Sequence, residues 1–466
     1  MKKMCAVGVV CLLFAVAAFA ANGTWTGASD GVWSVTGNWQ DGVVASGAGS
    51  AANFQNLAGP IRVTNDVAGL KLASVVLRGG AYSLYGQPLT FEGATWNTLG
   101  VTGGTHTVES PLNMNGNLQV AVESGARLTT SGLLDNLGTF SIQKRGGGEW
   151  VFSGASYETN AANFFDIEGG VFRVASGAVL TKRGGTREQF RVGYSGRAGR
   201  VVVEPGAALN IAGFVLGHDT AAATGHMLID GGTLTADTTD TSNPILVGRY
   251  GVGVFCASNN AAVDIANWFN VGVFMRGELH IGGNSTMTAG RLSLGWHTQE
   301  NGAFAGPGVA TVGSGTLSVL NQFVWRSSGV ASRTNLVTVG NGTPGSATLR
   351  LPATMRTASQ NGSARLTLDG GTLEMIGVRT TATGVSLTNY LFGLEQLWVG
   401  RAGAGFDTGT NVVEITQTVT RAPSVTRDGG VVKTGAGTLT LAGGCAYNGP
   451  TVVLQGTLRQ IGRAHV

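Results

Sequence analysis

The densest group of acidic residues in the sequence is Glu149, Asp166 and Glu168. Two carboxylates flanking a glycosidic bond are the groups that hydrolyse polysaccharides, one as acid and one as base or nucleophile. The spacing of Asp166 and Glu168 would place both on one face of a strand. However, no two acidic residues are adjacent anywhere in the chain, and a solvated strand edge explains the group more simply. We predict no catalytic residue and no enzyme, with a polysaccharide-processing enzyme as the alternative.

Metal and cofactor sites are not predicted either. His218 and His226 are the closest pair of histidines and have no cysteine at metal-ligand spacing. Asp237, Asp240 and Asn243 offer oxygen ligands for calcium, but the Gly-Gly-x-Gly-x-Asp nonapeptide of calcium-binding β-helices is missing. The glycine-rich stretches are not followed by the Gly-Lys-Ser/Thr of a phosphate loop. We therefore expect no metal and no cofactor.

The N-terminus has the pattern of an export signal. Lys2 and Lys3 precede an apolar run at 5–19, which is short for a membrane span, and Ala-Phe-Ala at 18–20 fits a cleavage site. We predict a Sec-type signal peptide over 1–21 and an extracellular or cell-surface location. After its removal Cys256 and Cys445 remain, and we expect both to be buried free thiols.

Composition excludes several classes of protein. Glycine supplies 76 residues without a Gly-X-Y period, and charged residues are 12% of a chain that is 43% hydrophobic. These values exclude collagen and a solvated disordered chain. The formal net charge of +4 includes two lysines of the signal segment, so the mature surface is close to neutral and nucleic acid is not an expected partner.

A repeated sequence pattern predicts the fold in which these residues lie. An aliphatic residue and a glycine are followed by a loop, an alternating strand, a turn and a second strand. The landmark glycines are 24, 31, 24, 23 and 45 residues apart, and the last gap is interpreted as two periods: Gly193, Gly217, Gly248, Gly272, Gly295 and Gly340. A helix-free period of this length predicts an all-β, right-handed parallel β-helix or β-solenoid with turns of about 23 residues. A β-sandwich array would instead have turn signals every 8–12 residues.

Tryptophans mark the N-terminal part of the solenoid. Trp25, Trp33 and Trp39 lie among glycines, and we expect them to close the open end of the solenoid as a cap. Alternatively, they form a platform on which a sugar stacks, and they are the candidate binding residues. We assign residues 22–100 to the cap and first turns, and residues 101–427 to the solenoid repeats.

Residues 428–460 carry a more specific pattern: Gly-Gly-Val-Val-Lys-Thr-Gly-Ala-Gly-Thr-Leu-Thr-Leu, then Tyr-Asn-Gly-Pro-Thr, then Gly-Thr-Leu. This segment resembles the autotransporter-associated β-strand repeat of bacteria. Residues 146–174 resemble a degenerate copy. The resemblance implies a passenger-type β-helix displayed at the cell surface, and it transfers no catalytic residue because the repeat has none.

Function is therefore expected from length and a repetitive surface. We predict an exported structural or adhesive surface protein whose partners are surface glycans or other cells, with a carbohydrate-binding surface protein as a further alternative. Residues 461–466 are interpreted as a sequencing-adapter artefact at a truncated end, so we expect the membrane anchor to lie outside this fragment. If the intact protein ends in a β-barrel, it would associate with the outer membrane.

Overall fold

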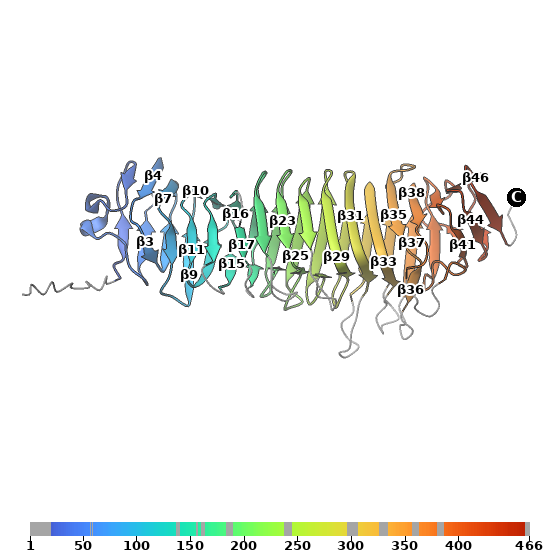
Figure 1. Ribbon diagram of the computed structural model, residues 1–466, viewed down its shortest axis with the longest axis horizontal. Coiled ribbons are helices and arrows are strands. Elements are labelled where there is room, and N and C mark those ends of the chain that lie inside the picture. The colour runs from blue at the N-terminus through green and yellow to red at the C-terminus, as the bar shows by residue number, and fades with distance from the viewer. Residues whose placement is uncertain are drawn as a thin grey trace, which may run out of the picture.

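The chain forms an elongated β-solenoid whose turns stack along one axis (Figure 1). The described residues form about 15 turns of about 25 residues with essentially no helix, so the all-β parallel prediction is confirmed and the predicted turn is slightly short. The described chain has no helix that is long and apolar enough to span a membrane. This computed structural model describes residues 20–461 except 56, 58, 137–139, 155–156, 160–163, 183–189, 237–244, 296–305, 326–333, 357–362 and 380–385.

Some predictions fall outside the described residues. Nearly all of the signal segment does so, as do Asp237, Asp240 and Asn243 and residues 462–466.

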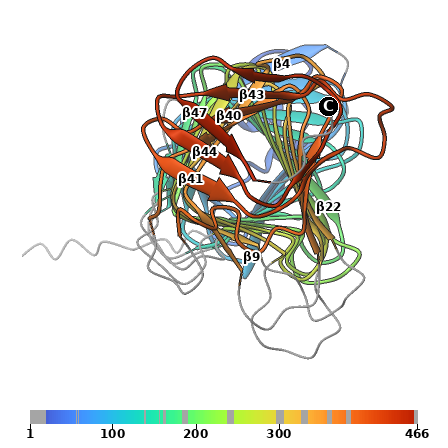
Figure 2. The ribbon, with the colours of Figure 1, turned by 90° about the vertical axis from the view of Figure 1, so that its right-hand side faces the viewer.

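Each turn contributes strands to three faces, here called face 1, face 2 and face 3 in chain order, and Figure 2 shows them along the axis. Face 1 contains β2 (Gly31–Val32), β4 (Pro60–Asn65), β7 (Ala81–Gly86), β10 (Thr105–Val108), β13 (Arg127–Thr130), β16 (Glu149–Phe152), β19 (Gly170–Val174), β22 (Ala198–Val203), β25 (Thr224–Asp230), β28 (Val252–Ser258), β30 (Gly277–Ile281), β32 (Gly308–Val312), β34 (Thr334–Val339), β37 (Ser363–Leu368), β39 (Gln396–Val399), β42 (Val419–Arg421) and β45 (Cys445–Ala446).

Face 2 contains β5 (Lys71–Leu72), β8 (Leu89–Phe91), β11 (Leu112–Met114), β14 (Leu134–Asn136), β17 (Tyr157–Thr159), β20 (Val179–Lys182), β23 (Ala208–Ile211), β26 (Thr233–Ala236), the first parts of β29 (Ala262–Val271), β31 (Ser285–Leu294) and β33 (Gly315–Trp325), then β35 (Ala347–Leu351), β38 (Gly371–Met375), β40 (Ala404–Asp407), β43 (Val431–Thr434) and β46 (Thr451–Val453).

Face 3 contains β1 (Gly23–Trp25), β3 (Ala51–Phe54), β6 (Ser74–Leu77), β9 (Trp96–Val101), β12 (Asn117–Val122), β15 (Ile142–Arg145), β18 (Phe165–Ile167), β21 (Phe190–Val192), β24 (Phe214–Leu216), β27 (Ile245–Val247), the second parts of β29, β31 and β33, then β36 (Thr354–Arg356), β41 (Val412–Ile415), β44 (Thr438–Leu441) and β47 (Thr457–Gln460).

Alternating side chains build one continuous core. Inward residues of successive turns are direct partners, as in the face 1 row Leu128, Trp150, Phe172 and Val201, and all four are completely buried. The rings of Trp150 and Phe172 lie 4.8 Å apart. Because each inward residue is covered by the turns on both sides, the apolar burial that stabilises the fold accumulates along the axis.

The landmark glycines turn corners where two backbones meet. All six have positive φ, between 68° and 103°. A Cβ at Gly193 would lie 2.1 Å from the carbonyl oxygen of Thr224 in the next turn, so glycine is required there. Gly193 to Gly295 follow strands of face 3, but Gly340 follows β34 on face 1. The 45-residue gap is therefore not two periods of one column, and this part of the predicted register is wrong.

The tryptophan cap is confirmed. Trp25 ends β1, and Trp39 lies between the two 3-10 turns η1 (Thr36–Asn38) and η2 (Gln40–Gly42). The ring centres of Trp25 and Trp33 lie 5.3 Å and 5.1 Å from that of Trp39, and Phe54 of β3 packs against all three. This aromatic cluster covers the first turn.

Candidate functional site

The densest acidic group is engaged in ion pairs rather than left free. Glu149 lies in β16 on face 1, whereas Asp166 lies in β18 on face 3 and Glu168 follows it. Asp166 and Glu168 are each only 1% exposed, so the predicted solvated edge is wrong. Arg145 Nη2 donates to Glu168 Oε1 at 3.1 Å, and Arg173 Nε to Glu149 Oε1 at 2.6 Å.

Asp166 is held by both of its oxygens. Arg191 Nε and Nη2 donate to Asp166 Oδ1 and Oδ2, each at 2.6 Å. The guanidinium also lies 4.0 Å from the ring centres of Phe164 and Tyr194. Burial raises the pKa of Asp166, while the hydrogen bonds and charge of Arg191 act in the opposite direction. A carboxylate clamped in this bidentate way stabilises the wall of the solenoid and is poorly placed to exchange a proton with a substrate.

His218 follows β24 on face 3, whereas His226, Cys256 and Cys445 lie on face 1. Arg249 Nη1 lies 2.9 Å from His218 Nε2, and Cys256 Sγ lies 3.6 Å from His226 Nε2. Among the described residues no group of three or more His, Cys, Asp and Glu is arranged to hold a metal ion. Cys256 and Cys445 are free, as predicted, but half-buried rather than buried. Burial raises the pKa of the Cys256 thiol to about 11.

The candidate binding tryptophans show no ring face to solvent. Trp25 and Trp33 are completely buried and Trp39 is 3% exposed. Their indole N–H groups donate to the carbonyls of Gly27, Ala45 and Trp33 at 3.0, 3.0 and 2.7 Å. A stacking platform needs exposed, coplanar rings, and these three buried rings do not present one in this structure.

The C-terminal segment that resembles a repeat is organised around a buried lysine. Lys433 of β43 is completely buried, and burial lowers its pKa. Its Nζ donates to the carbonyls of Gly435 and Gln455 at 2.7 and 3.2 Å, and also to that of Thr434. Gln455 belongs to the following turn, so the ammonium ties the corners of two turns together.

Asp428 fixes the loop that precedes β43. Its Oδ1 accepts from the amides of Gly430 and Gly449 at 2.9 and 2.8 Å, and Oδ2 accepts from the amide of Asn448 at 2.7 Å. Asn448 Oδ1 in turn accepts from the amide of Asp428 at 3.0 Å. These bonds use both carboxylate oxygens and join two successive turns.

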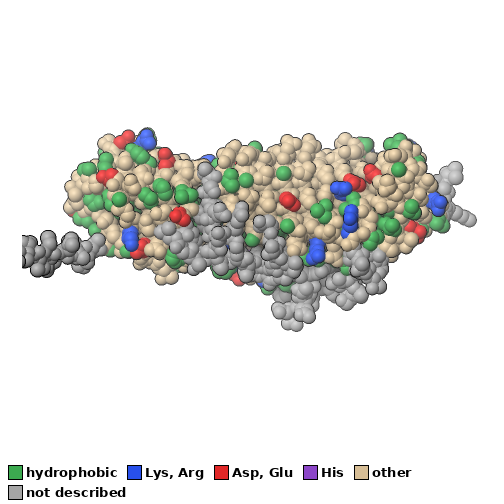
Figure 3. Space-filling view, viewed as in Figure 1, with side chains coloured by type: hydrophobic (Ala, Val, Ile, Leu, Met, Phe, Trp, Pro, Cys, Tyr) green, Lys and Arg blue, Asp and Glu red, His purple; other side chains and the backbone are tan. Residues whose placement is uncertain are grey.

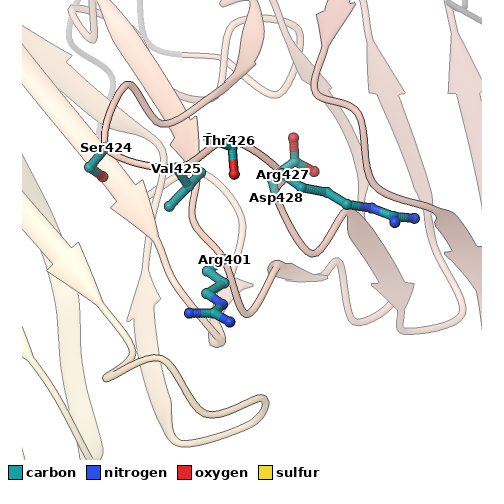
Figure 4. Close-up of a pocket in the computed structure, with 6 residues that line it drawn as sticks. All are labelled: Arg401, Ser424, Val425, Thr426, Arg427 and Asp428. Carbon is teal, nitrogen blue, oxygen red and sulfur yellow. The ribbon is translucent and has the colours of Figure 1, made fainter.

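A surface hollow of about 530 Å³ lies beside this loop. Figure 4 shows Arg401 on one side and residues 424–428 on the other. The lining residues are Arg401, Ser424, Val425, Thr426, Arg427 and Asp428. Arg401 and Arg427 are exposed, and within the described residues neither forms an ion pair. The hollow therefore combines two cations with two hydroxyls.

A second hollow of about 230 Å³ adjoins the first, because Arg401 and Asp428 line one and their chain neighbours Ala402 and Gly429 line the other. It lies over face 2, where Thr372, Gly405 and Val432 are outward partners on β38, β40 and β43. Gly405 places no side chain between its two partners. The hollow is lined largely by glycine and extends across several turns.

The sequence predictions missed these residues. The Val-Gly pair before Arg401 repeats the aliphatic-glycine pattern of the other corners. This pattern predicts the corner but gives no sign of the hollow beside it. Gly405 lies in an alternating strand, where a glycine signals close approach of another group, and this signal could have drawn attention to it.

Comparison with known families agrees with the fold. Residues 431–459 match the passenger-associated-transport-repeat family, which lies within the segment that resembled the repeat. Comparison with curated proteins and with solved structures gives no match. Together, the repeat at the C-terminal end and the β-solenoid fit an autotransporter passenger-type β-helix repeat protein.

Proposed function

We propose that this chain is a passenger-type segment with a structural or adhesive role at the cell surface and no catalytic activity. The passenger-associated repeat indicates an exported or cell-surface protein. The observation that carries the proposal is the engagement of the acidic group. Glu149, Asp166 and Glu168 are each paired with an arginine, which leaves no free pair of carboxylates there to act as acid and base.

The shape supports a role that depends on length. One buried cluster extends from Trp25 to Leu441, so neighbouring turns brace one another along the axis. Charged side chains are few and scattered among uncharged polar ones on the visible face (Figure 3). Such a surface contacts partners through many weak, repeated interactions. We propose surface glycans or other cells as those partners, a Sec-type signal as the export route, and association with the outer membrane.

The proposal is tested by displaying the full chain on beads and measuring adhesion to glycan-coated and cell-coated surfaces. We expect adhesion that increases with the density of the displayed chain. In parallel, the soluble chain is incubated with neutral and acidic polysaccharides, and new reducing ends or unsaturated products are measured. A product whose release is abolished by Glu149→Gln would overturn the proposal that the chain is not catalytic. Absence of adhesion to every surface would overturn the proposal of an adhesive role.

A further inference from the structure

The two hollows near the C-terminal end are lined by neighbouring residues of the same corner. The corner at 400–403 contributes Arg401 to the larger hollow and Ala402 and Gly403 to the smaller one. Backbone amides and carbonyls of Gly345, Gly370 and Gly403 bond to one another across three turns at 2.6 and 2.7 Å. Gly370 and Gly403 are buried and Gly345 is exposed, so a ligand can approach the backbone of this edge closely at Gly345.

The floor of the smaller hollow depends on Gly405. Its outward partners Thr372 and Val432 carry side chains, and the Thr372 hydroxyl reaches over Gly405, with Oγ1 2.5 Å from where a Cβ would stand. Because Gly405 itself has no side chain, a sugar ring can lie above it and contact the Thr372 hydroxyl. The lining includes Thr372 and Thr434, whose hydroxyls can donate to or accept from a sugar.

The larger hollow supplies positive charge. Its single carboxylate, Asp428, is 3% exposed and accepts from three backbone amides, so it competes little for the arginines. In Figure 4 the Arg401 side chain points down, away from residues 424–428, and the Arg427 side chain extends to the right. Both arginines line the hollow, and their guanidinium groups point in different directions without converging. This arrangement suits acidic groups spaced along a chain better than one small anion.

We propose that the two hollows together bind a segment of an acidic polysaccharide. A sugar ring lies over Gly405, and the carboxylate or sulfate groups of the chain pair with Arg401 and Arg427. Arginine is suited to both groups because its planar guanidinium donates two parallel hydrogen bonds. The combined volume falls within the range of small-ligand sites, roughly 300–1,000 Å³. The inference rests on the proposed adhesive function and names its ligand class.

The test measures binding of the full chain to polygalacturonate, chondroitin sulfate and a neutral galactan. We expect both acidic polymers to bind and the neutral galactan to bind at least about tenfold more weakly. Galacturonic acid monomer should also bind at least about tenfold more weakly than its polymer, because it cannot span both arginines. A monomer that binds as tightly as the polymer would overturn the proposal.

Two variants locate the site. Arg401→Glu should weaken acidic-polymer binding by roughly tenfold or more. Gly405→Val should do the same, because the new side chain would cover the floor of the hollow and displace the Thr372 hydroxyl, which lies 2.5 Å from the added Cβ. Arg78→Glu is the matched control, because Arg78 is also exposed and forms no described ion pair, and it should change affinity by less than about twofold. Unchanged circular dichroism confirms that each variant folds.

The outcomes separate this inference from the function on which it rests. Acidic-polymer binding that Arg401→Glu and Gly405→Val leave intact would overturn the site, even if bead adhesion persists and the adhesive function stands. Loss of binding in both variants, with the Arg78→Glu control intact, supports the site. If the chain adheres to no surface and binds neither acidic polymer, both proposals fail together.

Discussion

Lys144 and Lys433 make the same three contacts at distant corners of the solenoid. Each ammonium donates to the carbonyls of the next two residues and to one carbonyl in the following turn. For Lys144 these carbonyls belong to Arg145, Gly146 and Gly169, each at 2.9 Å. Lys144 lies on face 3 and Lys433 on face 2. This arrangement of a buried lysine is therefore local and is not restricted to one face of the solenoid.

Because Lys144 and Lys433 make equivalent contacts, the degenerate repeat extends further toward the N-terminus. The similarity placed at 146–174 omits Lys144, yet Lys-x-Gly-x-Gly occurs at 144–148 as it does at 433–437. In both copies the last glycine lies before a strand with buried inward residues, Trp150 and Phe152 in one and Leu439 and Leu441 in the other. The structural copy therefore begins at the strand that carries the lysine.

Replacing Lys144 by methionine should loosen this corner. The change keeps an apolar stem but removes the donor to three carbonyls, and we expect the local opening free energy to fall by about 2–3 kcal/mol. Hydrogen exchange of the Gly148 amide, which bonds to Val122, measures this opening. Lys71→Met, at an exposed salt bridge, is the control and should change the exchange of nearby amides little. Equal effects of the two variants would contradict a special role for Lys144.

The same lysine should make stability depend on pH. Burial lowers the pKa of Lys144 from 10.5 to about 8, so between these values the unfolded chain holds a proton that the folded chain has lost. Stability should therefore rise with pH in that window, by up to about 1.4 kcal/mol per unit. Because Lys182 and Tyr82 also titrate at high pH, the measured quantity is the difference in unfolding free energy between the wild type and Lys144→Met. A difference that shrinks from pH 8 to pH 10 would contradict the assignment.

Two glycines with the same backbone conformation should respond differently to alanine. Gly193 and Gly177 have φ of 71° and 77°, but a Cβ at Gly193 would lie 2.1 Å from Thr224 O, whereas a Cβ at Gly177 meets nothing within 4 Å. Gly177→Ala should cost only the left-handed strain, about 1 kcal/mol. Gly193→Ala should cost roughly 2 kcal/mol more, because the turns must move apart. The thermal midpoints of the two variants test this, and equal shifts would show that contact between turns does not matter.

Local patterns predicted the parts of the structure that depend on local geometry. Alternation predicted the inward rows, because strand side chains point to opposite faces, and the aliphatic-glycine phrase predicted corners such as Gly193. Local patterns could not predict the length of each turn, because this length varies. Stacked partners are 22 residues apart at Leu128 and Trp150 but 31 apart at Leu279 and Ala310. Loops of variable length absorb this difference, so the period alone could not show that Gly340 lies on another face.

Burial of outward residues could not be predicted either. Val215 and Leu246 point outward from face 3 but are 0% and 4% exposed, and Val273 and Phe274 pack with them. Asp166 lies in the same outward row and is also buried. Such cover comes from segments of neighbouring turns, and no pattern within one strand records it. The contact of Lys433 with Gln455 also joins two turns, so the pattern of one strand could not predict it.

The tryptophan cap should matter for stability. Trp33→Ala removes a completely buried ring that packs against Trp39 and Phe54, and we expect a loss of about 3–5 kcal/mol in the stability of the first turns. Trp398→Ala is the matched control, because Trp398 is only half-buried on an outward position of β39 beside Arg365 and should lose about 1 kcal/mol or less. Limited proteolysis between residues 20 and 100 measures the difference. If Trp33→Ala leaves this region resistant to protease but abolishes binding to a glycan array, the tryptophans serve recognition, and the buried cluster must open to bind.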